Sequence, residues 1–231
     1  SNQSSGNSVL AYSRAFDGTL TFSGGFPTGG RGAGTGVDPL GSQDAVALGS
    51  GQRLLFAIPA GSNEVSMFAV RGTGLVLLDK EPSGGEMPVS VAVNGFLVYV
   101  LNAGGTPNIS GFIVDPFSNR LIPLRGSRQQ LAGGSSADPA DIRFNADGNV
   151  LLVTEKGTQT IDIYRVNFQG YAEGPIPHES YGVAPFGFSI IKRGFAIVAE
   201  PGSEAVSSYE LHENGELSLV SGSVALGQKA P

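Results

Sequence analysis

Cysteine and tryptophan are absent from the 231 residues, and histidine occurs only twice, as His178 and His212. The lack of cysteine excludes disulfides, zinc–thiolate sites and thiol catalysis. Two histidines cannot supply a three-histidine metal site within one chain. Charged residues make up only 15 %, and the net charge of −6 argues against nucleic acid or an anionic membrane as a partner. No apolar run approaches the roughly 18–20 residues that cross a bilayer.

Glycine and proline are abundant instead, with 35 and 14 residues, and apolar residues make up 40 % of the chain. So many helix breakers argue against a helical bundle or coiled coil. The apolar content together with the low net charge argues against disorder. Many short strands joined by glycine-rich turns fit this composition best, so we expect an all-β fold.

A repeat of about 45 to 50 residues runs through the chain. An apolar strand ends in a turn that contains glycine, and a strand of alternating character follows, with an aromatic residue at one fixed place. The first kind of strand covers 54–58, 96–101, 150–154 and 195–199. The second kind covers 7–14, 63–70, 108–115, 159–166 and 204–211, with Tyr12, Phe68, Phe112, Tyr164 and Tyr209 as its aromatics. We expect these aromatics to pack between neighbouring units.

Each unit is completed by an outer strand and by a small-residue strand that opens the next unit. Four antiparallel strands at such a period are typical of a β-propeller blade. A β-sandwich is the competing interpretation, although it does not predict the same strand order four times over. We therefore predict one propeller domain over 1–231. Its whole units are 44–85, 88–127, 139–180 and 185–223, and 7–25 supplies half a blade.

Several short motifs, in this order, resemble a known family. They are Asp38-Pro39-Leu40-Gly41-Ser42-Gln43, Ser83-Gly84-Gly85 leading to Pro88-Val89-Ser90-Val91, Val98 to Gly104, Val153 to Gly157, Pro185-Phe186-Gly187-Phe188 and Ser207-Ser208-Tyr209. Their order resembles the lactonase family of seven-bladed β-propellers. That family includes bacterial 6-phosphogluconolactonase-like proteins and fungal carboxymuconate-lactonising enzymes, or carboxymuconate cyclases. The resemblance implies a ring of which this chain covers about four and a half blades.

The resemblance also implies a fungal or otherwise secreted protein that handles lactones. Enzymes of the family resemble one another in a histidine near the start of an innermost strand, ahead of a turn like Asn145-Ala146-Asp147-Gly148. Ala140 occupies the matching position here. We therefore expect a propeller that binds a small polar, carboxylate or lactone ligand. A lactone hydrolase, a muconate-type cycloisomerase and a secreted interaction protein without catalysis remain as alternatives.

Strand direction places the expected site. Successive strands of a blade are antiparallel, so residues that enter first strands and residues that end second strands share one rim of the central channel. We expect ligand contacts there from Ser42, Gln43, Asn102, Asp141 and Lys156. Glu155 and Glu200 hold corresponding places in neighbouring units, so they are the candidate acid and base. The alternatives are that both carboxylates accept bonds from turn amides, that Asp141 pairs with Arg143, and that Asn102 caps its own turn.

We expect no cofactor at this rim, although two carboxylates could also hold a cation such as Ca²⁺. The sequons at Asn2 and Asn108 are candidate glycosylation sites. They favour a secreted or extracellular protein over a cytoplasmic one. An arc of four and a half blades leaves a sheet face uncovered at each end. We expect further blades from a second polypeptide, or self-association through the open ends, to cover these faces.

Overall fold

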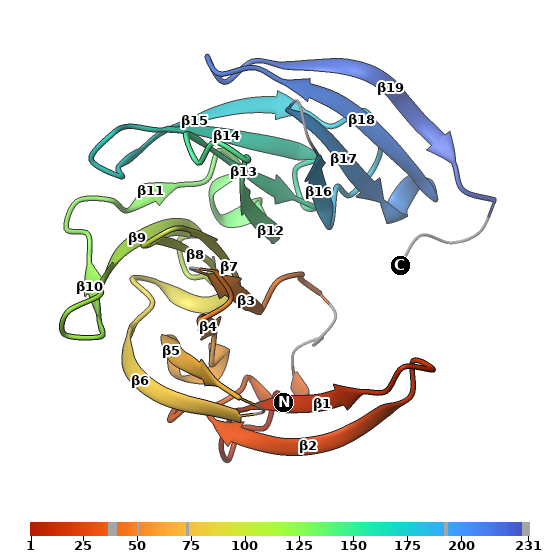
Figure 1. Ribbon diagram of the computed structural model, residues 1–231. Helices are drawn as coiled ribbons and strands as arrows, with labels where there is room; N and C mark the ends of the chain where they lie inside the picture. Colours follow the sequence, from red (N-terminus) through yellow and green to blue (C-terminus); the bar gives the residue numbers. More distant parts are fainter. Residues whose placement is uncertain (37–40, 50, 73, 192–193, 228–231) are drawn as a thin grey trace.

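The computed structural model describes residues 1–36, 41–49, 51–72, 74–191 and 194–227, so Asp38-Pro39-Leu40 of the first family-like motif lies outside the described residues. The strands group into five antiparallel sheets, which we number as blades 1 to 5 in chain order (Figure 1). Blade 1 holds β1 (Ser8–Arg14) and β2 (Leu20–Pro27). Blade 2 holds β3 (Val46–Gly49), β4 (Leu54–Ala57), β5 (Glu64–Arg71) and β6 (Gly74–Pro82).

Blade 3 is formed by β7 (Glu86–Asn94), β8 (Leu97–Gly104), β9 (Asn108–Asp115) and β10 (Arg120–Pro123), with the short β11 (Gln129–Gln130) also paired to β9. Blade 4 is formed by β12 (Pro139–Phe144), β13 (Val150–Glu155), β14 (Thr160–Val166) and β15 (Ala172–Glu179). Blade 5 is formed by β16 (Phe188–Ile191), β17 (Phe195–Glu200), β18 (Ala205–Leu211) and β19 (Leu217–Ala225). The helical parts of the described chain are single 3-10 turns at Gly34–Gly36, Ala60–Ser62, Gly134–Ser136 and Pro201–Ser203.

The order of strands within each sheet is the one predicted from the repeat, and the β-propeller fold is confirmed. Each hairpin pairs sequential strands, because alternating apolar residues and short glycine-containing turns favour antiparallel neighbours. The sheets follow one another in an arc, with the first strands of blades 2 to 5 towards its centre (Figure 1). Blade 1 is at one end of the arc and blade 5 is at the other.

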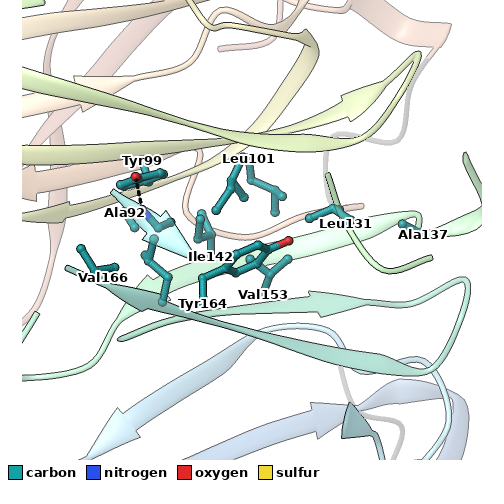
Figure 2. Packing of buried hydrophobic residues seen from close by; sticks show 12 residues of the cluster. Ala92, Tyr99, Leu101, Leu131, Ala137, Ile142, Val153, Tyr164 and Val166 are labelled. Atoms are coloured by element: carbon teal, nitrogen blue, oxygen red, sulfur yellow. Dashed lines mark hydrogen bonds between the residues drawn. The ribbon is translucent and has the colours of Figure 1, made fainter. Parts of the chain in front are cut away.

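The hydrophobic core lies between the blades rather than within them. One cluster joins blades 3 and 4 and includes Tyr99, Leu101, Ile142, Val153 and Tyr164 (Figure 2). The Tyr99 hydroxyl accepts a hydrogen bond from the Ala172 amide at 2.8 Å, and the Tyr164 hydroxyl donates to the Gln130 carbonyl at 2.9 Å. Such bonds satisfy the polar end of a ring that is otherwise buried.

Four of the five fixed-position aromatics belong to these inter-blade clusters, as the repeat predicts. The exposed fractions of Phe68, Phe112, Tyr164 and Tyr209 are 1, 1, 0 and 3 %. Tyr12 differs, because its side chain is 53 % exposed and makes an edge contact with Phe22 at 5.6 Å. A bulge between Ala11 and Tyr12 and the terminal position of blade 1 explain the difference.

Candidate functional site

The segment from Gly41 to Ala45 lies against the first strands of blades 3 and 4 at the centre of the arc. The Gln43 amide donates to the Ala140 carbonyl at 2.9 Å, and the Ser42 hydroxyl donates to the Val89 carbonyl at 3.1 Å. The Asp44 carbonyl accepts from the Val91 amide at 3.0 Å. Ser42 and Gln43 therefore lie beside these first strands, and their hydrogen bonds hold the segment from Gly41 to Ala45 in place.

Lys156 also binds this segment, through a hydrogen bond from its ammonium to the Gly41 carbonyl. Its ammonium is 3.3 Å from Asp138 Oδ1 and 5.4 Å from the centre of the Phe186 ring. The ammonium is thus stabilised by a cation–π interaction and by an ion pair. Lys156 therefore holds Gly41 beside the end of β13.

Asp44, Asp141 and Arg143 form a charge network at the centre of the arc. Arg143 Nε is 3.0 Å from Asp141 Oδ2, and Arg143 Nη2 is 2.8 Å from Asp44 Oδ2. Asp141 Oδ2 accepts a further bond from the Phe188 amide at 3.2 Å, and the Ser90 hydroxyl lies 3.3 Å from Asp141 Oδ1. The predicted pairing of Asp141 with Arg143 follows from their spacing of two on β12, which places both side chains on one face.

The surroundings change the acidity of both aspartates. Burial raises the pKa of Asp141 to about 6, although the Arg143 guanidinium opposes the shift. Burial also raises the pKa of Asp44, and Arg143 again opposes it. Asp141 is fully buried, whereas the side chains of Asp44 and Arg143 are 30 and 36 % exposed. Asp141 is therefore a positioning partner for Arg143, while Asp44 and Arg143 can meet a ligand.

A cavity of about 520 Å³ lies beside this network, between the first strands of blades 2 to 5. Its polar side chains come from Asp44, Asn94, Arg143, Asn145 and Ser189. The remaining walls are mainly small or branched apolar residues of β3, β7 and β12. The surface of this cavity is mainly polar, although apolar residues also line it, and several convergent polar groups in a hollow are a usual feature of small-molecule sites. Sequence reasoning missed Asp44, although this residue enters a first strand just as Ser42 and Gln43 do.

Glu200 does not face the channel, contrary to the prediction. Its side chain is fully buried and its two oxygens accept bonds from the Gly182 amide and from the hydroxyls of Ser180, Ser207, Tyr209 and Ser223. Ser180 and Gly182 belong to the loop that connects blade 4 to blade 5. The carboxylate therefore anchors the incoming loop, as the alternative interpretation holds.

Glu155 has the same position in blade 4. It is fully buried, and its oxygens accept bonds from the Gly133 amide at 3.2 and 3.1 Å and from the Thr158 hydroxyl. The expectation that Glu155 and Glu200 converge at the channel mouth as acid and base is wrong, because each points into its own blade. Strand direction alone does not decide which way a side chain at the end of a strand points.

Asn102 is the blade 3 counterpart of these glutamates. It is fully buried, and its side-chain nitrogen donates to the Ser83 carbonyl at 3.3 Å and to Asn108 Oδ1 at 3.2 Å. It anchors the loop between blades 2 and 3 and has no access to a ligand, so the expected binding role is wrong. Its neighbour Asn108 is equally buried and donates to the Thr106 carbonyl, so the folded chain has no room for a glycan there.

Asn2, in the other sequon, is partly exposed, but its side chain also holds a loop. The amide oxygen accepts from the Ala33 amide at 2.8 Å, and the nitrogen donates to the Gly34 carbonyl at 3.2 Å. Among the described residues there is no group of three or more His, Asp or Glu side chains that could hold a metal ion. The same part of the chain has no helix long and apolar enough to cross a membrane.

No protein-family model matches the sequence, and no curated protein matches it. Solved structures do match its fold. A Lactobacillus plantarum protein has a TM-score of 0.73 at 20 % identity, over 94 % of this chain and 66 % of its own. The periplasmic gluconolactonase of Pseudomonas aeruginosa has a TM-score of 0.64 at 17 % identity, over 94 % of this chain and 65 % of its own. A candidate 6-phosphogluconolactonase from Bacteroides uniformis has a TM-score of 0.65 at 16 % identity, over 97 % of this chain and 80 % of its own.

The fold is that of the lactonase-type β-propellers. Identities this low show the fold alone, because one fold carries many chemistries. The chain spans slightly less than two thirds of the Lactobacillus plantarum and Pseudomonas aeruginosa proteins. Ala140, at the position matched to the family's histidine, is buried in β12 and offers no acid or base.

Proposed function

We propose that this lactonase-type propeller binds a small, neutral, polar ligand of the lactone or polyol class in its central channel. The observation that supports the proposal is the Asp44–Arg143 pair, partly exposed beside a cavity of about 520 Å³. A carboxylate accepts hydrogen bonds from hydroxyl groups, and a guanidinium donates hydrogen bonds to a carbonyl oxygen. Together they complement a lactone that carries hydroxyl groups.

Charge favours a neutral ligand over an anionic one. Arg143 is the only cationic side chain among the described residues that line the cavity, and it is already paired with Asp44 and Asp141. A carboxylate or phosphate on the ligand would have to compete with two aspartates for one guanidinium. Like charges at such short range are strongly disfavoured.

Titration calorimetry with gluconolactam, a stable neutral analogue of a sugar lactone, tests the binding proposal. We expect Asp44→Asn to weaken binding by at least about tenfold, because a hydrogen bond to a charged group contributes roughly 1.5–3 kcal/mol. Arg165→Ala is the matched control, since this arginine is half exposed on β14, outside the cavity. Equal affinity in wild type and Asp44→Asn would contradict the assignment. No heat with any neutral lactone analogue would favour the secreted interaction protein.

Lactone hydrolysis is the second candidate, and the same pair supports it. A partly exposed carboxylate with a raised pKa can take a proton from water, and a neighbouring guanidinium can stabilise the oxyanion. If the chain is a hydrolase, Asp44→Asn lowers kcat for glucono-δ-lactone at least about a hundredfold. Muconate cyclisation is the remaining alternative, and its anionic substrate fits this channel less well.

We also propose a secreted or periplasmic location and further polypeptide against the end blades. The location is supported by the periplasmic gluconolactonase among the similar structures. The association of further polypeptide with the end blades is supported by large exposed apolar side chains on blades 1 and 5. These include Leu10, Tyr12 and Phe22 on blade 1 and Ile191, Ile197 and Val220 on blade 5. Apolar surface of this kind favours association, either with further blades or with a second copy.

A further inference from the structure

Blade 4 contains two buried carboxyl groups that lie within hydrogen-bonding reach of each other. They belong to Glu155, the last residue of β13, and Asp162, the third residue of β14. Both side chains are fully buried. Two ionised carboxylates cannot hydrogen-bond to each other, because each only accepts. A bond between them needs one proton on the pair.

The neighbouring donors do not supply that proton. The Gly133 amide donates to Glu155, and the Ala132 amide donates to Asp162 Oδ2 at 2.9 Å. The Tyr164 hydroxyl lies 2.9 Å from the Gln130 carbonyl but 3.4 Å from Asp162 Oδ2, so its proton goes to the carbonyl. Asp162 Oδ1 is buried and has no hydrogen-bond partner.

Blade 5 shows the same site with a different donor. Glu200 corresponds to Glu155, and Ser207, seven residues further on, corresponds to Asp162. The Ser207 hydroxyl donates to Glu200 Oε2 at 2.8 Å. Asp162 can make the equivalent bond to Glu155 only when its carboxyl is protonated.

Neither carboxyl forms an ion pair with a described lysine, arginine or histidine. The loop from Leu131 to Ala137, which covers them, contains no charged residue. Tyr164 also faces the pair, and burial, followed by the two nearby carboxylates, raises its pKa far above the ordinary value. Since a phenol bears no positive charge, ionising both carboxyls would leave two unneutralised negative charges in the interior.

We propose that Asp162 carries a proton in the folded protein and donates it to Glu155, so that the loop joining blades 3 and 4 is held by a shared-proton carboxyl pair that loosens in alkaline solution. Burial, followed by the contact with Glu155, raises the pKa of Asp162 to about 8. An aspartate in an unfolded chain has a pKa near 3.9. The folded protein therefore holds one more proton on Asp162 between about pH 4 and pH 8.

The folded state binds the extra proton, so raising the pH through this window favours the unfolded state. The contribution of Asp162 to the folding equilibrium constant falls by up to roughly tenfold per pH unit. Above about pH 8 Asp162 has lost the shared proton, so the hydrogen bond between the carboxyls is lost, and their repulsion weakens the bonds to the Ala132 and Gly133 amides.

Chemical unfolding between about pH 5 and pH 9, compared among variants, tests the proposal. Asp162→Ser installs the hydroxyl that blade 5 uses, and Asp162→Asn installs an amide donor. We expect both variants to lose the Asp162 contribution, so the wild type loses stability more steeply with rising pH than either of them. Glu173→Gln is the control, because this exposed β15 carboxyl lies outside the pair and is expected to retain the wild-type slope.

Two further measurements on the wild type keep the test decisive if a variant fails to fold. Infrared spectroscopy at neutral pH should show the carbonyl stretch of a buried protonated carboxyl that disappears at alkaline pH. Hydrogen exchange of the segment from Leu131 to Ala137 should accelerate above about pH 8 beyond the ordinary base-catalysed increase. Absence of the protonated band, or equal pH slopes in wild type, Asp162→Ser and Asp162→Asn, would overturn the proposal.

Discussion

Truncation of Glu200 to alanine distinguishes a structural carboxylate from a catalytic one. The change removes the acceptor for the Gly182 amide and for four hydroxyls, all in a fully buried site. The hydroxyls can turn towards other acceptors, but the amide cannot. An orphaned buried donor costs about 1–3 kcal/mol, and each lost bond to a charged acceptor contributes about 1.5–3 kcal/mol. Since such terms are not additive, we expect a total loss of about 3–5 kcal/mol of unfolding free energy.

Glu200→Gln is the informative partner variant. It keeps the shape and one oxygen, and the serine hydroxyls can rotate to accept from the new amide group. We therefore expect a smaller loss, about 1–2 kcal/mol. Urea unfolding at constant m-value measures both losses. Glu213→Ala, on the exposed turn between β18 and β19, should stay within about 0.5 kcal/mol of wild type.

The two roles predict opposite results. A loss below about 1 kcal/mol in Glu200→Ala, together with abolished lactone binding or turnover, would refute the structural role. It would mean that the carboxylate faces the channel in solution. A large loss of stability with unchanged ligand affinity in Glu200→Gln would support the anchoring of the blade 4–5 loop.

Three further outcomes are expected. Phe112→Ala should lower the free energy of unfolding by about 3–5 kcal/mol, measured with urea. Tyr12→Ala should lower it by less than about 1 kcal/mol, because the Tyr12 ring is half exposed. Equal losses in the two variants would mean that the described packing is wrong. The pKa of Asp141 is raised to about 6, so its contribution to stability should fall as the pH rises from about 4 through 6. Asp141→Asn should lack this dependence, and an unchanged pH profile would contradict the burial of Asp141. Light scattering of the purified chain should show species heavier than the 23.7 kDa monomer, and a homogeneous monomer would contradict association through the end blades.

Much of the fold could be predicted from the sequence because its determinants are local. Period-2 alternation and glycine-containing turns specify strands and hairpins within a few residues. The predicted strand at 108–115 coincides with β9, and the apolar stretches at 54–58 and 150–154 differ from β4 and β13 by one residue at one end. The order of strands in each sheet followed from the same repeat.

The candidate site could be predicted only in part. Antiparallel order predicts which strand ends share a rim, and it puts Ser42, Gln43, Asp141 and Lys156 on the same rim as Glu155, Glu200 and Asn102. It could not tell whether Glu155, Glu200 and Asn102 point to the channel or into the blade. That depends on the loops from preceding blades, whose amides and hydroxyls approach these side chains and draw them inward.

The sequence alone determined the class of fold, the blade repeat and the exclusion of disulfides and thiol chemistry, since composition and spacing carry these. Tertiary structure decided the chemistry of the site. Asp44 and Arg143 are far apart in the chain and meet only because the segment before β3 crosses the channel to reach β12. The tertiary structure likewise buries Asp162 beside Glu155, because the loop that donates to both carboxyls covers them. Charge, burial and proton affinity arise from such long-range packing, which no local pattern encodes.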